Sequence, residues 1–183
     1  MTALVLAGAA TRVSRSGAVA AAVCREVRLR GGDAVLWDLT AQPLPLLGSG
    51  PCTAVDSLRR LVQDADMLVW VTPCYHGSYS GLLKNCLDHL STDDLRGKPV
   101  GVVTVGASLA AITASEHLRT VARALGCVTT PTQVVVTGSG HHDPGFAPEH
   151  ERLADMVAEL RVLTSATLSL RRSAGLDVLP LAE

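Results

Sequence analysis

Thr72-Pro-Cys-Tyr-His-Gly-Ser-Tyr-Ser-Gly-Leu-Leu-Lys-Asn85 carries the strongest structural signal in this chain. The apolar run Met67–Val71 comes directly before it and has the composition of a buried strand. The segment leads into Leu82–Leu90, where apolar residues recur at helical spacing. A strand, a loop rich in Gly and Ser, and a helix in this order are typical of a parallel α/β sheet. Such loops present backbone donors to a ligand at the carboxyl edge of the strands.

The rest of the chain repeats this alternation of strands and helices. Besides Met67–Val71, strand patterns occur at Ala3–Ala7, Ala34–Leu39, Val100–Val105 and Gln133–Val136. Besides Leu82–Leu90, helical patterns occur at Gly17–Arg30, Ala54–Ala65, Ala110–Leu125 and Pro148–Arg172. Five strands separated by helices predict a parallel sheet with helices on both faces. No internal repeat or long linker divides the sequence, so we expect a single domain over residues 1–183, with the polar loop Thr137–Pro148 as a lid.

Composition excludes several classes of function. The 183 residues are 48% hydrophobic and 18% charged, which is the composition of a globular protein. The net charge of −1 and the lack of a dense basic cluster disfavour nucleic acid as a partner. No apolar stretch reaches the roughly 18 residues of a membrane span, so no membrane partner is expected.

The cysteines and the amino terminus indicate a cytoplasmic protein. The five cysteines are scattered, with no C-x-x-C pair, which argues against a disulfide framework and a zinc site; they are Cys24, Cys52, Cys74, Cys86 and Cys127. Residues 1–8 lack the basic leader of a signal peptide, and their apolar run ends at a glycine, so a first buried strand is the better interpretation.

The loop after the first strand, Gly8–Ser16, is a candidate phosphate site. A helix N-terminus offers unpaired N–H groups and a partial positive charge, both of which suit a phosphate. The loop adds hydroxyl donors at Thr11, Ser14 and Ser16 and cations at Arg12 and Arg15. The alternative is an ordinary helix start, capped by Ser14 or Ser16, with both arginines in solvent.

The segment Thr72–Asn85 resembles the flavin-ring loop of the NAD(P)H-dependent FMN reductases, which carry T-P-x-Y-H-x-S-x-x-G-x-L-K-N at this place. The resemblance implies an α/β flavodoxin-like three-layer sandwich with a five-stranded parallel sheet in the order 2-1-3-4-5. It also implies FMN as cofactor and NADPH or NADH as hydride donor. In that fold three loops converge on the flavin: Gly8–Ser16 (loop one), Thr72–Gly81 (loop two) and Gly106–Ser108 (loop three).

The resemblance implies a set of cofactor-binding residues and no proton-transfer catalyst, because the flavin supplies the chemistry. Pro73 would turn the chain away from the sheet, and the backbone of loop two would face the flavin ring. The implied cofactor-binding residues are Gly8, Thr11, Arg12, Ser14, Arg15, Ser16, Pro73, Cys74, Tyr75, His76, Gly77, Ser78, Gly106 and Ala107.

The chain departs from the family pattern in two of the three loops. In loop one the family has G-S-x-R-x-x-S, whereas Ala9 replaces the serine and Thr11 replaces the arginine. Ala107 replaces the second glycine of a Gly-Gly pair. Its methyl group narrows the approach of the flavin to the backbone unless the φ angle of Ala107 stays negative. The missing donors in loop one predict weaker FMN binding.

Several residues keep a plainer interpretation. Tyr75 and His76 also fit an ordinary surface loop, and Ser78 also fits a cap for the following helix. Lys84 and Asn85 fit a structural role or a dimer contact better than proton transfer. Cys74 and Cys86 look like small buried hydrophobic residues.

One histidine has a more specific counterpart among relatives. His117 matches a helix position that forms a π-bulge at the tetramer interface in the FMN reductases of two-component sulfonate monooxygenases. The alternative is an exposed helical histidine.

The resemblance implies hydride transfer from NAD(P)H to FMN in a cytoplasmic homodimer or homotetramer. An FMNH2-dependent monooxygenase is the expected partner. The alternatives are a reductase of quinones, azo compounds or metal oxyanions with tightly bound FMN, and a flavodoxin-like scaffold without flavin. No G-x-G-x-x-G follows the first strand, so a Rossmann dinucleotide site is disfavoured. Arg12, Arg15, His141 and His142 are candidates for the adenosine phosphate of NADPH.

Overall fold

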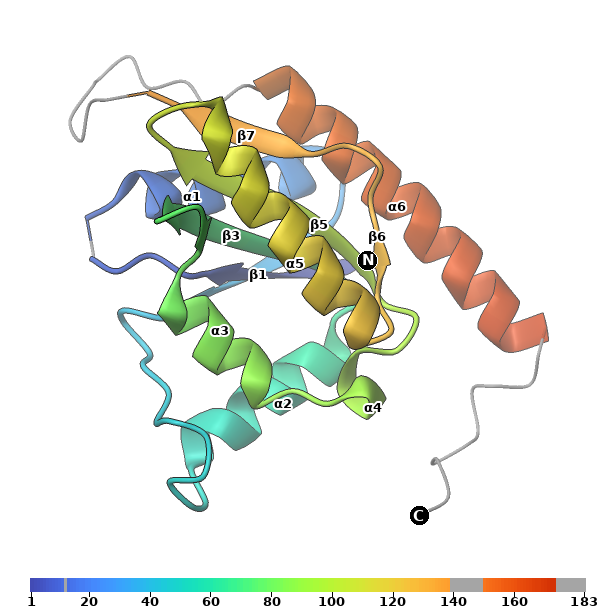
Figure 1. Cartoon of the computed structure of the whole chain (residues 1–183). Helices are drawn as coiled ribbons and strands as arrows, with labels where there is room; N and C mark the ends of the chain where they lie inside the picture. Colours follow the sequence, from blue (N-terminus) through green and yellow to red (C-terminus); the bar gives the residue numbers. More distant parts are fainter. Residues whose placement is uncertain (12, 139–149, 174–183) are drawn as a thin grey trace.

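The computed structural model describes residues 1–11, 13–138 and 150–173. Within them a single sheet lies between two layers of helices (Figure 1). Neighbouring strands follow the order β2-β1-β3-β5-β6, with β4 paired to β3 and β7 paired to β5. The strands are β1 (Thr2–Ala7), β2 (Asp33–Asp38), β3 (Met67–Tyr75), β4 (Ser78–Tyr79), β5 (Pro99–Gly106), β6 (Val128–Thr129) and β7 (Val134–Thr137).

The predicted flavodoxin-like order is confirmed, with seven strands instead of five. β1, β2, β3 and β5 pair in parallel, as expected. The predicted fifth strand, Gln133–Val136, is β7, and the short strand β6 before it was not predicted; both pair with β5 in parallel. Pro131 lies between them, and a proline interrupts a ladder because it has no N–H group. The seventh strand is β4, which is antiparallel to β3.

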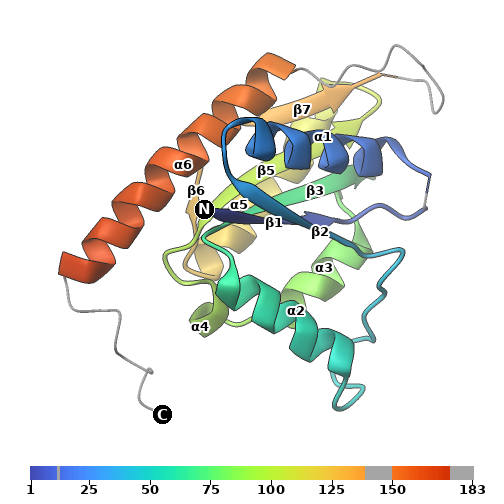
Figure 2. The same cartoon turned by 180° about the vertical axis from the view of Figure 1, so that it is seen from behind.

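Helices cover both faces of the sheet, as the alternation predicted. α1 (Arg15–Leu29) and α6 (His150–Ser173) lie on one face, and α2 (Thr53–Asp64), α3 (Gly81–Asp88), α4 (Thr92–Leu95) and α5 (Ile112–Ala124) lie on the other (Figure 2). The sequence did not predict the short α4 or the 3-10 turn η1 (Leu109–Ala111) that precedes α5.

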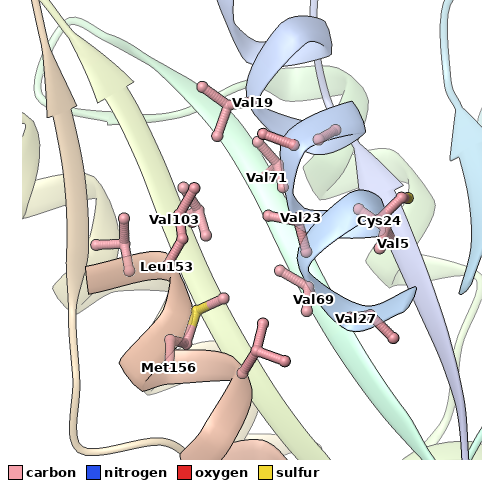
Figure 3. Close-up of a cluster of buried hydrophobic side chains, with 14 of the residues drawn as sticks. Val5, Val19, Val23, Cys24, Val27, Val69, Val71, Val103, Leu153 and Met156 are labelled. Atoms are coloured by element: carbon pink, nitrogen blue, oxygen red, sulfur yellow. The ribbon is translucent and has the colours of Figure 1, made fainter. Parts of the chain in front are cut away.

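Alternation along the central strands creates two cores. In β3, Val69 and Val71 point toward α1 and α6, whereas Leu68 and Trp70 point toward the opposite helices. Figure 3 shows the first of these clusters, in which valines of β1, β3 and β5 meet α1 and Met156 of α6. Because β3 and β5 are buried on both faces, their sequences are nearly continuous apolar runs.

The structure corrects the predicted path after β3. Pro73 does not turn the chain away; it lies inside β3 opposite Val105 of β5. Alternate residues of a parallel strand bond to the same neighbour. Val71 accepts a hydrogen bond from Gly8 N, so Pro73 also faces the β1 side, where β1 has already ended. Its missing N–H group therefore leaves the pairing with β5 intact, and β3 continues to Tyr75.

Among the helices of the described residues, none has the length and apolarity needed to cross a lipid bilayer. Most of the loop predicted as a lid, Thr137–Pro148, lies outside the described residues.

Candidate functional site

The carboxyl ends of β1, β3 and β5 meet at one edge of the sheet, because the three strands are parallel neighbours. The three loops singled out from the sequence follow these strands. In doubly wound sheets this edge is where ligands bind.

A pocket of about 320 Å³ opens between loops two and three. Five predicted residues line it: Cys74, His76, Gly77, Gly106 and Ala107. Four further residues complete the lining: Ser108, which ends the predicted third loop, and Ala110, Ala111 and Thr113, which sequence reasoning missed. They belong to η1 and its flanks, a stretch of small residues that directly follows the Gly106 loop and could have been noticed for that reason. A hollow of about 370 Å³ on α1 is formed by that helix alone and brings no loops together.

Loop two is a tight β-hairpin, which the sequence did not predict. β3 and β4 pair at Cys74 with Tyr79 and at Tyr75 with Ser78. The two connecting residues, His76 and Gly77, have φ angles of 51° and 78°. Positive φ at both positions defines the turn that matches the twist of a hairpin. His76 and Gly77 line the pocket, whereas Tyr75 is exposed and does not.

Ser80 joins loops one and two. Its hydroxyl donates to the carbonyl oxygen of Gly8 at 2.6 Å and accepts from Leu83 N at 3.2 Å, where it caps α3. Its own N–H group donates to Thr72 Oγ1 at 3.0 Å. Ser80, and not Ser78, is therefore the cap of this helix. A serine shortly before the apolar helical pattern was the available signal.

Loop one is mainly a capped helix start. Ser14 caps α1 by accepting a hydrogen bond from Gly17 N at 3.0 Å, and the Thr11 hydroxyl donates to Val13 O at 3.0 Å. Ser16 is buried, and Arg12 lies outside the described residues. The capped-helix interpretation thus accounts for Ser14, while α1 still directs its N-terminus toward the edge where the three loops meet.

Arg15 connects α1 to the loops that follow β5 and β7. Its guanidinium donates to the carbonyl oxygen of Gly106 at 3.0 Å and also to that of Gly138. Part of the donor capacity proposed for a phosphate is therefore used to fix neighbouring loops.

The floor of the pocket needs a glycine at position 106. A Cβ there would lie 2.5 Å from Ala111 Cβ, closer than two non-bonded carbon atoms can approach. Ala107 is different: among the described residues His76 is the non-glycine residue with positive φ, so the methyl of Ala107 is accommodated without backbone strain.

The residues with plainer interpretations have definite partners. Asn85 Nδ2 donates to Pro45 O at 2.9 Å, and Lys84 pairs with Asp88 within α3, an interaction that raises the pKa of Lys84. Both contacts are structural. His117 Nδ1 lies 3.0 Å from Ser78 Oγ. The helix around His117 is α-helical from Ile112 to Ala124, without the π-bulge that the resemblance implied.

The cysteines differ in burial. Burial raises the pKa of the Cys86 and Cys127 thiols to about 12, so both are inert at neutral pH. Cys74 is only half-buried and lines the pocket, which corrects its prediction as a buried hydrophobic residue. No group of three His, Cys, Asp or Glu side chains in the described ranges could hold a metal ion.

Comparison with known proteins places this chain in a family. The family model of NADPH-dependent FMN reductase matches residues 1–142, and the chain belongs to that family. The FMN-dependent NADPH-azoreductase of Staphylococcus aureus is 33% identical over 159 residues, with 82% of each chain covered. The chain is therefore an oxidoreductase that uses FMN and NADPH.

Solved structures agree on the fold. An oxidoreductase from Corynebacterium diphtheriae has a TM-score of 0.76 at 24% identity, covering 90% of this chain and 97% of its own. An NADH:FMN oxidoreductase in its apo form has a TM-score of 0.71 at 22% identity, covering 90% and 89%. A flavodoxin from Streptococcus pneumonia has a TM-score of 0.60 at 17% identity, covering 88% and 99%.

The pocket fits the ring system of FMN. Its volume lies at the lower end of the range for cofactor pockets, and its lining consists mainly of small side chains and glycine backbone that a planar ligand can approach closely. Cys74, Gly77, Gly106 and Ala107 would hold the ring, and the start of α1 would face the phosphate. FMN, when bound, accepts a hydride from the nicotinamide, and the protein contributes binding and orientation.

Proposed function

We propose that this protein is an NAD(P)H:FMN oxidoreductase that binds FMN exchangeably and supplies reduced FMN to a partner monooxygenase. The observation that carries the proposal is that loop one offers reduced hydrogen-bond donor capacity to a phosphate. Ala9 is buried and offers no hydroxyl, and the Arg15 guanidinium is engaged by the carbonyls of Gly106 and Gly138. A charge-assisted hydrogen bond contributes about 1.5–3 kcal/mol, so losing one weakens FMN binding roughly tenfold to a hundredfold.

Exchangeable binding of FMN also agrees with the solvent exposure of loops two and three. His76, Gly77, Ala107 and Ser108 are all exposed although they line the pocket, so the ring site is accessible from solvent. A flavin held by a shallow ring site and a depleted phosphate site leaves readily after reduction. Homo-oligomerisation and a cytoplasmic location belong to the same proposal.

A second candidate is azo-compound reduction by tightly bound FMN. The similarity to the staphylococcal azoreductase extends over 82% of both chains and favours it. The two candidates differ in whether FMN is a substrate or a resident cofactor, and therefore in kinetic mechanism.

The test measures FMN content after purification, FMN affinity by fluorescence, and NADPH oxidation as a function of added FMN. Micromolar affinity, substoichiometric FMN and saturation kinetics in FMN support the exchangeable flavin. Stoichiometric FMN and ping-pong kinetics between NADPH and an azo dye support the second candidate. Failure to bind or reduce FMN contradicts both.

A further inference from the structure

Two side chains of α5 contact the turn of the β3–β4 hairpin. Thr113 Oγ1 donates to Gly77 O at 2.8 Å, and His117 Nδ1 lies at hydrogen-bond distance from Ser78 Oγ. Residues four apart on a helix project from the same face, so Thr113 and His117 meet the hairpin together. The hairpin follows β3 and α5 follows β5. Both contacts therefore join two parts of the pocket lining that come from different strands of the sheet.

The hairpin has little support of its own. β4 has two residues, and its pairing with β3 is limited to two residue pairs. Tyr75, His76 and Gly77 are exposed, and His76 adopts a backbone conformation that is unfavourable for residues with a Cβ. A two-stranded ribbon of this length is not stable alone in water. Its position therefore depends on contacts from outside, and the side chains of α5 supply those that reach the turn itself.

We propose that Thr113 and His117 are positioning residues that hold the His76–Gly77 turn as a wall of the flavin pocket and so set the affinity for FMN. The inference rests on the proposed function in assuming that FMN occupies this pocket. Thr113 is well placed for the role, because its side chain lines the pocket while its hydroxyl bonds the turn. A fixed turn presents its backbone groups to the ligand without an ordering cost on binding.

The Thr113 contact is also easily released. The hydroxyl lies 2.8 Å from Gly77 O and equally 2.8 Å from Ala110 O in its own helix. A hydroxyl has one proton, so its hydrogen bond to the turn competes with the bond to the helix. When the turn moves outward, the hydroxyl keeps a partner at Ala110. The clamp that Thr113 and His117 form on the turn is therefore weak enough to open when flavin enters or leaves. Removing the Thr113 hydroxyl has a several-fold effect on the affinity for FMN.

The test uses Thr113→Val, which keeps the shape and removes the donor, and Thr113→Ser, which restores the hydroxyl. Thr120→Val is the matched control, since Thr120 on the same helix bonds to Glu116 O within the helix and does not line the pocket. We expect Thr113→Val to weaken FMN binding about threefold to tenfold, the effect of one neutral hydrogen bond. Thr113→Ser should stay within about twofold of the parent protein, and Thr120→Val should leave the affinity unchanged.

A second readout does not need flavin. Amide hydrogen exchange over residues 74–79 of the flavin-free protein should accelerate about threefold to tenfold in Thr113→Val and not in Thr120→Val. His117→Leu should accelerate the same amides, while His117→Asn, which keeps a polar atom near the Nδ1 position, should do so less.

If amide exchange is unchanged in both Thr113→Val and His117→Leu, the proposal that α5 holds the turn is wrong, whatever the FMN affinity of the two variants. Faster exchange with unchanged FMN affinity would overturn its role in binding. If the parent protein does not bind FMN, the proposed function fails, and the exchange data still decide whether α5 holds the turn.

Discussion

Replacing Ser80 with alanine should destabilise the protein more than removal of an ordinary helix cap. The hydroxyl of this buried side chain caps α3 at Leu83 N and also donates to Gly8 O. Loss of a cap costs about 1 kcal/mol. The carbonyl of Gly8, which is buried, would in addition lose the donor, at a cost of about 1–3 kcal/mol. Ser80→Ala should therefore lower the free energy of unfolding by about 3 kcal/mol.

The matched control is Ser14→Ala, because Ser14 caps α1 through Gly17 N and makes no cross-loop hydrogen bond through its side chain in the described chain. It should lose about 1 kcal/mol, the cap alone. Urea unfolding of both flavin-free variants, followed by circular dichroism, gives the two free energies. In thermal melts the difference corresponds to about 4–8 °C for a chain of this length. Equal losses in the two variants would refute the argument that Ser80 fastens loop one to loop two.

Three further changes follow from the same structure. Gly106→Ala should cost about 1–3 kcal/mol, because a Cβ there overlaps Ala111, whereas Gly81→Ala, with no atom within 4 Å, should be neutral or stabilising in thermal melts. His76→Val should lower the melting temperature more than His76→Gly, because φ is 51° and a branched side chain tolerates it poorly; equal melting temperatures would contradict this. Burial raises the pKa of Cys86 from 9.0 to about 12, so the neutral thiol stabilises the fold below pH 9. That stability is lost from pH 9 to 12, and Cys86→Ala should flatten this part of the unfolding free energy measured against pH.

The features predictable from the sequence are those encoded by neighbouring residues. Apolar runs such as Met67–Val71 and the helical spacing in Leu82–Leu90 specify buried strands and amphipathic helices through local period alone. Because the elements alternate, a parallel sheet with helices on both faces followed from general rules of chain connection. The family resemblance supplied the strand order and with it the position of Gly8 and Gly106 at the same edge of the sheet.

The features that could not be predicted depend on partners far away in the chain. Nothing near Pro73 indicates that β3 continues through the proline; this depends on β5, about thirty residues later, where Val105 lies opposite Pro73. The hydrogen bond from Ser80 to Gly8 joins residues 72 positions apart. The pocket lining at Thr113 likewise depends on how η1 and α5 fold back over the hairpin.

These long-range contacts explain how loops from distant parts of the chain form a defined pocket. Ser80 fastens loop two to loop one, Arg15 fastens α1 to loop three, and Thr113 fastens α5 to loop two. Each of these donors satisfies a backbone carbonyl, and a donor engaged in this way is not fully available to a ligand. The loops are thus held in place by side chains of the protein, and Arg15 uses in this way part of the donor capacity predicted for the phosphate. Under the proposed function, the described residues recognise flavin by shape at the ring and offer few charged contacts to its phosphate, which favours release.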